Sequence, residues 1–269
     1  MNKEKRDMLF NQAKDWVLEA GRNIRHKIKD PLHIDTKSNA NDLVTAMDKE
    51  TEEFFADHIK GKYPDHSILS EEGFGDDLNS LEGVVWIIDP IDGTMNFVHQ
   101  KKNFAISLAI YEDGIGEIGL IYDVMSDVLY QAKHGEGAYK NDIPLTPLDK
   151  DKKFEEVVFG LNHFWLCENR LVGEKYMQQF VKDVRGTRTY GSAALEFAFV
   201  AEGVLDGYLS MNLAPWDVAA GMVIVKETGG VTTNIDGNQL SLLDKDSVLT
   251  VNPSIQERLL DSYIKVGRK

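Results

Sequence analysis

The chain has 269 residues, of which 42% are hydrophobic and 28% charged, an ordinary balance for a soluble globular protein. Its formal net charge of −14 argues against nucleic acid as the main partner, because a duplex-binding protein needs a basic face. The single cysteine, Cys167, excludes an intrachain disulfide framework and favours a reducing cytosol, so we expect a cytoplasmic protein. No apolar run approaches 18 residues and none follows the Lys-rich start, so the sequence predicts neither a membrane span nor a signal peptide.

The first half of the chain predicts two helices followed by short strands. Apolar residues recur every three to four positions over residues 3–29, which predicts an amphipathic helix. A second helix is expected from Asp48 to about Lys62, with Pro64 ending it. Residues 135–145 predict the last hairpin of this half. Five runs with strand character lie between, separated by Gly, Asn and Asp: His66–Ser70, Val84–Ile88, Ala105–Tyr111, Ile118–Asp123 and Asp127–Ala132.

The polar residues 147–155 are the predicted boundary between an N-terminal half, 1–150, and a C-terminal half, 151–269. Beyond them strands and helices alternate, which predicts a layered α/β arrangement. Cys167 would then lie in a helix. In chain order we expect a strand at Val157–Gly160, helices at 166–183 and 192–203, a strand at Asp206–Ser210, a helix at 216–228, a strand at 247–252 and a helix at 253–265.

Residues 86–99, WIIDPIDGTMNFVH, form the most informative segment. They place Asp89 and Asp92 at the end of an apolar run, directly before Gly93 and Thr94. Carboxylates hold hard cations such as Mg2+, and the backbone N–H groups of such a turn, opening a helix at Thr94, can point at phosphate oxygens. An ordinary surface turn would explain Asp, Pro and Gly, but not a second acid three residues after the first. The segment therefore predicts a metal-assisted phosphate site.

Two neighbouring interpretations of this segment fail. Phosphatases of the haloacid dehalogenase type carry a nucleophilic Asp two positions before the second acid, where this chain has Pro90. An EF-hand loop needs alternating oxygen ligands and a late bidentate Glu, which are missing here.

Three other segments supply acids of the same kind. They are Asp42–Asp48 (DLVTAMD), Glu71 and Glu72 at the end of an apolar run, and Asp217 in APWDVAAG. Each alone has an ordinary explanation, since a Glu pair is usually solvated and an Asp that begins a helix is usually an N-cap. Together with the Asp89 segment they predict one acidic site.

These segments resemble the inositol monophosphatase family of lithium-sensitive, metal-dependent phosphomonoesterases, whose first signature is Trp-x-x-Asp-Pro-[Ile/Leu]-Asp-Gly-Thr. The other family segments occur in the same order, so the resemblance covers nearly the whole chain: Asp-Leu-Val-Thr-x-x-Asp at 42–48, Glu-Glu at 71–72, Gly-Ser-Ala-Ala at 191–194 and Trp-Asp-x-x-[Ala/Gly]-Gly at 216–221. The resemblance implies a five-layer αβαβα sandwich, a homodimer, and Mg2+-dependent hydrolysis of a small phosphorylated substrate.

The resemblance also implies a set of metal ligands. One Mg2+ would bind Glu71, Asp89 and the carbonyl of Ile91, and a second would bind Asp89, Asp92 and Asp217. A third ion would share Glu71 and waters. Two ions roughly 3.5–4 Å apart can bind the phosphate, acidify a water and stabilise the departing oxygen. The negative net charge does not oppose this chemistry, because surface charges are screened over about 8 Å at physiological salt.

The same resemblance assigns catalytic and phosphate-binding roles. Thr94 would orient the nucleophilic water and Asp48 would accept its proton, with Glu71 as a further catalytic residue. The residues expected on the phosphate or substrate side are Lys37, Asp92, Gly93, Thr94, Ala193 and Ser210. Ser192 is expected to cap a helix, with Ala neighbours that allow close approach of substrate. No histidine pair has a zinc-binding spacing and no Ser-His-Asp arrangement is visible.

The residues around the site bear on the substrate. Met95-Asn96-Phe97 follows the pattern of the inositol phosphatase branch. Animal members carry a Glu that contacts the inositol ring seven residues before Asp217, where this chain has Ser210. We therefore expect inositol 1-phosphate as substrate with a broad range that includes the 2′-phosphate of NADP. The alternatives are fructose 1,6-bisphosphate, adenosine 3′,5′-bisphosphate, or a non-catalytic metal-binding module, which would lose Thr94 and Asp48 while keeping the ligands.

Overall fold

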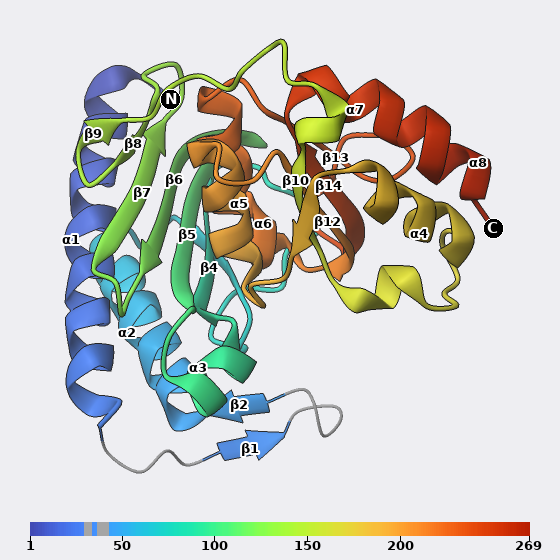
Figure 1. The fold of residues 1–269 in the computed structure, drawn as a ribbon. Helices are drawn as coiled ribbons and strands as arrows, with labels where there is room; N and C mark the ends of the chain where they lie inside the picture. Colours follow the sequence, from blue (N-terminus) through green and yellow to red (C-terminus); the bar gives the residue numbers. More distant parts are fainter. Residues whose placement is uncertain (30–33, 37–42) are drawn as a thin grey trace.

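The computed structural model describes residues 1–29, 34–36 and 43–269, which form five alternating layers of helices and sheets (Figure 1). Helices cover the outer face of a seven-stranded sheet, two further helices separate it from a five-stranded sheet, and helices cover the far face of that sheet. The predicted αβαβα sandwich is confirmed. Among the described residues, no helix combines the length and apolar character that crossing a bilayer requires.

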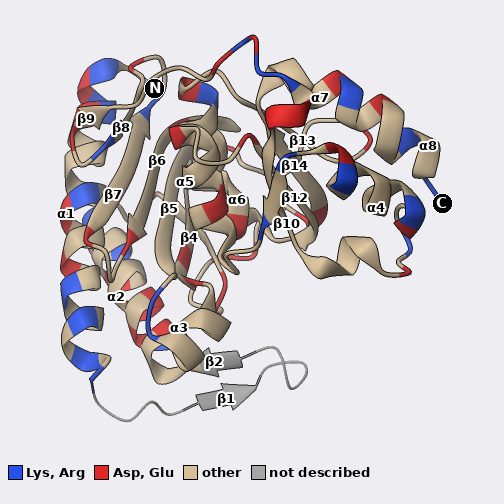
Figure 2. Cartoon of the chain, viewed as in Figure 1, with Lys and Arg blue, Asp and Glu red and all other residues tan. Residues whose placement is uncertain are grey.

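The first layer consists of helices α1 (Lys3–Lys27) and α2 (Ala46–Lys62). One stripe of α1 is buried and packs on the sheet, whereas its other faces carry acidic and basic side chains (Figure 2). Helix α2 begins at Thr45, whose side chain and backbone both bond with Asp48 in a capping box. The start of α2 is thereby fixed beside the strands β1 (Ile34–Thr36) and β2 (Leu43–Thr45), which pair in an antiparallel fashion.

The seven-stranded sheet has the strand order β3-β4-β5-β6-β7-β8-β9, with β3 and β4 parallel and every other pair antiparallel. Strand β4, which lies next to the edge strand β3, is buried along its whole length. The strands are β3 (Ser67–Ser70), β4 (Val84–Asp92), β5 (Ala105–Glu112), β6 (Ile115–Asp123), β7 (Val128–Lys133), β8 (Ala138–Lys140) and β9 (Ile143–Pro144).

An irregularity at the end of β4 places its two acids on one face of the sheet. Asp89 lies opposite Ser107 and Asp92 opposite Ala105, so β4 has one residue more than β5 over this interval. In a regular strand, residues three apart point to opposite faces. The extra residue reverses this, so both carboxylates point toward the central helices. The predicted strand ended at Ile88, but pairing continues to Asp92.

The central layer consists of α5 (Ala193–Glu202) and α6 (Pro215–Glu227). Both helices are rich in small side chains and share one hydrophobic core with residues of both sheets. Gly221 illustrates how closely they pack, because a Cβ there would lie 2.4 Å from the ring of Phe197. The site is therefore surrounded by tightly packed elements.

The five-stranded sheet has the order β11-β10-β12-β14-β13. Its strands are β10 (Val158–Leu161), β11 (Gly186–Arg188), β12 (Gly207–Leu213), β13 (Val231–Thr233) and β14 (Asp246–Val251). The outermost layer contains α4 (Glu174–Asp183) and α7 (Pro253–Leu259), which continues through a π-helical turn at Leu260–Ile264 into α8 (Lys265–Gly267). These elements enclose a separate hydrophobic core, which includes Phe159, Phe180 and Leu249.

The expected helix over 166–183 was wrong in its first half. A short 3-10 helix spans His163–Leu166, and α4 begins only at Glu174. Between them the Asn169 side chain accepts hydrogen bonds from the N–H groups of Leu171 and Val172, which holds the backbone in a turn. Cys167 is consequently exposed outside any helix.

The seven-stranded sheet comes from residues 67–144 and the five-stranded sheet from 158–251. The expected halves, 1–150 and 151–269, thus each contain one sheet, but α5 and α6 pack against both sheets in a single core. The division into two domains stays a prediction.

Candidate active site

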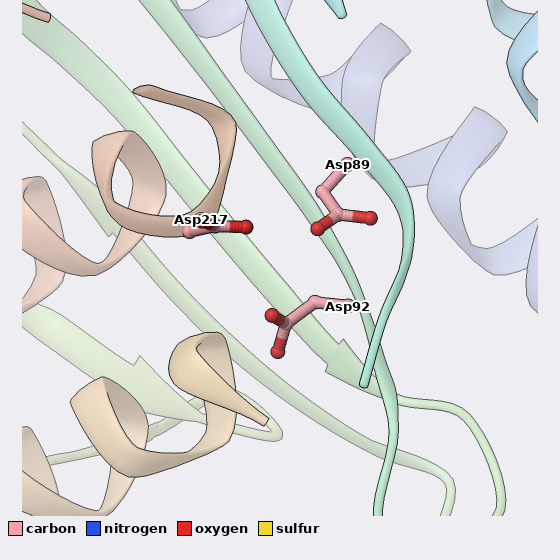
Figure 3. A group of neighbouring side chains, drawn as sticks. All are labelled: Asp89, Asp92 and Asp217. Atoms are coloured by element: carbon pink, nitrogen blue, oxygen red, sulfur yellow. The ribbon is translucent and has the colours of Figure 1, made fainter. Parts of the chain in front are cut away.

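Three carboxylates meet where the end of β4 faces the start of α6 (Figure 3). One oxygen from each of Asp89, Asp92 and Asp217 lies within 4.8 Å of the others. Asp89 and Asp92 are 2% and 5% exposed, so their charge is held away from solvent. Residues more than 100 positions apart in sequence thus form one acidic group, as the sequence predicted.

Asp92 is held by the start of helix α5. Its carboxylate accepts hydrogen bonds from the Ser192 hydroxyl and from the backbone N–H groups of Ala193 (3.2 Å) and Ala194 (2.9 Å). Ser192 is the N-cap of α5 and accepts a bond from Leu195 N–H, as expected. An acid from the first sheet therefore satisfies the free N–H groups of a helix from the second half.

Asp217 and Asp89 are each bonded to a nearby backbone N–H. Asp217 stands at the third position of α6 and accepts a hydrogen bond from Ala214 N–H at 2.7 Å. It therefore has a capping contact and a place in the acidic group at the same time. Asp89 accepts one bond, from Ile91 N–H at 3.0 Å.

A second pair of functional groups lies beside this cluster. The Thr94 hydroxyl is 3.2 Å from Asp48 Oδ1 and 3.1 Å from the Ile91 carbonyl oxygen. The other oxygen of Asp48 accepts bonds from the hydroxyl and backbone N–H of Thr45. Because a hydroxyl has one proton, Thr94 can donate to only one of its two acceptors at a time. The structure thus brings together Thr94 and Asp48 in the arrangement that the sequence predicted.

The turn between β4 and α3 (Thr94–Gln100) depends on glycine. Gly93 has a φ of 92°, a conformation that L side chains rarely adopt. A Cβ at Gly93 would also lie 3.1 Å from the Gly191 carbonyl oxygen. The Asn96 side chain donates hydrogen bonds to the carbonyls of Asn103 (2.8 Å) and Tyr190 (2.7 Å), which ties this turn to the segment before α5.

Burial and mutual repulsion disturb the ionisation of these acids. Burial raises the pKa of Asp92 to about 6 and that of Asp217 to about 7. It also raises the pKa of Asp48, and raises that of Asp89 well above the usual carboxyl range. The negative charge of Glu71 adds to all four shifts. Bringing a cation among these acids would offset both causes.

The donor set fits a hard divalent cation. All the candidate ligands are oxygens, from the carboxylates of Glu71, Asp89, Asp92 and Asp217 and from the carbonyl of Ile91. Oxygen donors are those that Mg2+ and Ca2+ prefer, and neither sulfur nor imidazole is among them. Since like charges are buried together, a bound cation would stabilise an arrangement that is otherwise costly.

The remaining predicted residues are placed as follows. Lys37 and Asp42 lie outside the described residues. Ala193 is buried at the start of α5, with its N–H directed to Asp92. Ser210 is buried on β12, on the same face as Tyr208.

Two buried polar residues near the site were not predicted. Tyr208 contributes a buried hydroxyl whose pKa is raised by burial and by the charges of Glu196, Asp92 and Asp217. Glu52 is fully buried on α2 and bonds with the segment around Glu71. The sequence could have indicated Glu52, because it is an acid on the apolar face of a predicted helix, four residues after Asp48.

The model of the inositol monophosphatase family matches residues 5–266 of the chain. The chain belongs to this family. The match includes all the candidate ligands and the Thr94–Asp48 pair. The resemblance inferred from the sequence is therefore confirmed.

Individual relatives are similar over nearly their whole length. The inositol-1-monophosphatase of Bacillus subtilis (strain 168) is 55% identical over 252 residues, which cover 94% of this chain and 95% of that protein. Structures of SaIMPase-II bound to inositol monophosphate and to 2′AMP have TM-scores of 0.86 and 0.88 at 41% and 42% identity. They cover 96% of this chain and 94% and 95% of theirs. An IMPase/NADP phosphatase complexed with Mg2+ and phosphate has a TM-score of 0.86 at 26% identity, covering 95% of each chain.

Proposed function

We propose that this protein hydrolyses phosphate monoesters with the help of Mg2+, and that inositol 1-phosphate is its main substrate. The observation that carries the proposal is the convergence of Asp89, Asp92 and Asp217 beside the Thr94–Asp48 pair. Metal ligands alone would serve a binding protein, but a hydroxyl held against a buried carboxylate is what activation of a water requires. The named relatives, an inositol-1-monophosphatase among them, support the same reaction.

The acids divide into two sets of ligands. Glu71, Asp89 and the Ile91 carbonyl would hold one ion, and Asp89, Asp92 and Asp217 a second, so Asp89 would belong to both sets. When bound, such ions neutralise the phosphate, lower the pKa of a water and stabilise the departing oxygen. A third ion sharing Glu71 and waters is part of the proposal. The Mg2+ complex of the IMPase/NADP phosphatase supports the choice of metal.

The side chains of this chain supply the proton transfer. Thr94 orients the attacking water with its hydroxyl, which faces Asp48 at 3.2 Å. Asp48 accepts the proton, and its raised pKa, caused mainly by burial, makes it a better base than an ordinary aspartate. The water forms a bond to phosphorus while the bond to the alcohol oxygen breaks. The departing oxygen takes a proton from solvent and Asp48 later releases its own to solvent, which leaves inorganic phosphate and the free alcohol. The N–H groups of Gly93 and Thr94 would hold phosphate oxygens, and Ala193 would lie on the substrate side; Lys37, which lies outside the described residues, is kept as a substrate-side residue from the family resemblance alone.

We propose a broad substrate range because of Ser210. It is uncharged and shorter than the Glu found in animal members, so it offers no charge-assisted hydrogen bond to an inositol hydroxyl. It also lacks a negative charge that would repel a second phosphate group. The 2′AMP complex of SaIMPase-II and the IMPase/NADP phosphatase support 2′-phosphates as further substrates, including that of NADP.

A phosphate-release panel tests the proposal. The purified protein is given inositol 1-phosphate, NADP, 2′AMP, fructose 1,6-bisphosphate and adenosine 3′,5′-bisphosphate, each with Mg2+ or with EDTA. We expect release from inositol 1-phosphate and from the 2′-phosphates in Mg2+ only. If the protein binds Mg2+ but releases phosphate from none of these compounds, it would instead be the non-catalytic metal-binding module. Preference for either bisphosphate would redirect the substrate assignment within the family.

We further infer a cytoplasmic homodimer that lithium inhibits. The single cysteine and the family resemblance support these inferences. Light scattering during gel filtration should give twice the mass of one chain, and the mass of one chain would contradict the dimer.

A further inference from the structure

Glu52 is a fully buried carboxylate that the proposed reaction does not use. It lies on α2 four residues after Asp48, so both acids project from the same face of the helix. A Glu is seldom fully buried unless it is paired. Its partners therefore indicate what it does.

Three hydrogen-bond donors converge on Glu52. In the sequence they lie on both sides of the candidate ligand Glu71. The Ser70 hydroxyl and the Phe74 N–H donate to Oε1 at 2.7 and 2.9 Å, and the Glu72 N–H donates to Oε2 at 2.6 Å. Glu52 thus holds the Ser70 side chain just before Glu71 and the backbone N–H just after it. Both of its oxygens are needed as acceptors.

The segment that Glu52 holds has no regular structure of its own. Residues 71–83 follow β3 without forming a helix or strand. Such a segment is restrained less than a strand end such as Asp89, which β4 fixes through its ladder. A metal site requires its ligands to be held within about 0.5 Å of the productive geometry. The Glu71 ligand therefore depends on contacts from outside its own segment.

We propose that Glu52 is a positioning residue that orients Glu71 and thereby sets the affinity of the site for Mg2+. This inference rests on the proposed function, because it assumes that Glu71 is a metal ligand. Outer-shell partners of metal ligands typically contribute about 10–100-fold in metal affinity or activity. Glu52 would act through the Ser70 side chain and the backbone N–H groups of Glu72 and Phe74 rather than by touching metal or substrate.

The same helix supplies a control farther along this segment. Lys60 on α2 donates to Asp76 at 2.7 Å, and Asp76 accepts from the N–H of Ile68. The Lys60 and Asp76 side chains are 41% and 36% exposed, so this pair contributes little to stability. It anchors the segment without lying next to Glu71.

The test compares Glu52→Gln with Lys60→Gln. An amide has one acceptor oxygen and two donors, so Glu52→Gln cannot satisfy all three partners. Calorimetry on the metal-free protein should show Mg2+ affinity lowered about 10–100-fold in Glu52→Gln. The Mg2+ concentration for half-maximal phosphate release should rise to the same extent, while kcat at saturating Mg2+ is largely recovered. Lys60→Gln should bind Mg2+ as the wild type does.

Several outcomes would overturn the inference. A folded Glu52→Gln protein with wild-type Mg2+ affinity removes the positioning role, and so does an equal loss in Lys60→Gln. If Glu52→Gln does not fold, Ser70→Ala removes one of the three bonds, and unchanged Mg2+ affinity in that variant contradicts the proposal. If the wild-type protein binds no Mg2+ at all, the proposed function itself is wrong. Failure of the proposed function can therefore be distinguished from failure of the positioning role of Glu52.

Discussion

Asp89 and Asp92 lie three residues apart on the same strand and are buried to the same degree, yet their surroundings differ. Asp92 accepts three hydrogen bonds from the start of α5, whereas Asp89 accepts one from Ile91 N–H. Burial raises the pKa of Asp92 to about 6 although these bonds offset part of that effect, and burial and the neighbouring acids raise the pKa of Asp89 well above its ordinary value. Asp92 therefore links the strand to α5 besides lying in the acidic group, a link that Asp89 lacks among the described residues.

The largest effect is expected when the acid that belongs to both sets of ligands is removed. Asp89→Asn should lower turnover at least about 10²–10³-fold, because it removes a ligand shared by both proposed ions. Its melting temperature in EDTA should be unchanged or higher, since one source of repulsion among buried acids is gone. Phosphate release and thermal melting measure the two effects. Wild-type activity in this variant would contradict the role of Asp89.

Thr94→Ala tests the Thr94–Asp48 pair rather than the candidate metal ligands. We expect a rate loss of about 10²-fold or more with Mg2+ binding retained, because the hydroxyl orients the water and holds no metal. Thr94→Ser keeps the hydroxyl and should retain most of the activity. If calorimetry shows that Thr94→Ala loses Mg2+ binding as well, the residue is structural.

Ser210→Glu tests the substrate side of the site. The added carboxylate should shift the ratio of kcat/KM for inositol 1-phosphate over NADP by about tenfold toward inositol 1-phosphate, through a charged hydrogen bond and repulsion of a second phosphate. Ser241→Glu adds the same charge at an exposed position and should leave the ratio unchanged. A wild-type protein that cleaves inositol 1-phosphate alone would show that Ser210 does not set the range.

The smallest expected effect is a difference in melting temperature between variants of the two acids on β4. Asp92→Asn places an amide group against the donors of Ser192, Ala193 and Ala194. A lost cap costs about 1 kcal/mol, or roughly 2–4 °C in a chain of this size. In EDTA, Asp92→Asn should therefore melt a few degrees below Asp89→Asn. Equal melting temperatures would mean that the contact with α5 does not stabilise the fold.

The sequence predicted that Asp89, Asp92 and Asp217 come together, because each lies in a short segment with a distinctive order of residues. The Asp-Pro-Ile-Asp-Gly-Thr run could be interpreted without a structure, and so could the acid at the start of α6. The extra residue in β4 could not, because the register depends on pairing with β5. Nor could the bonds between Asp92 and α5, which join segments about 100 residues apart.

The sequence-based predictions failed where a side chain forms hydrogen bonds in place of those expected within the backbone. Asn169 holds a turn in a stretch whose composition favours a helix, so the helix predicted over 166–183 begins only at Glu174. Glu52 was missed for a related reason. An acid on the apolar face of a helix has no visible partner until the fold brings residues 70–74 against it.

The central claim is that Asp89, Asp92 and Asp217 are held together for a cation. For Asp92 and Asp217, burial and repulsion raise the pKa to about 6 and about 7, above the ordinary carboxyl value of about 4. The folded protein therefore binds protons that the unfolded chain has released, and the stability that these groups contribute is lost as pH rises through about 6 and 7. Mg2+ would replace those protons.

The most direct measurement is the melting temperature between pH 5 and pH 8, in EDTA and in saturating Mg2+. We expect the melting temperature to fall across this range in EDTA and the fall to shrink or vanish in Mg2+, so that stabilisation by Mg2+ grows with pH. Asp89→Asn should lessen the difference between the two profiles. Identical profiles with and without Mg2+ would contradict the claim that these acids form a cation site.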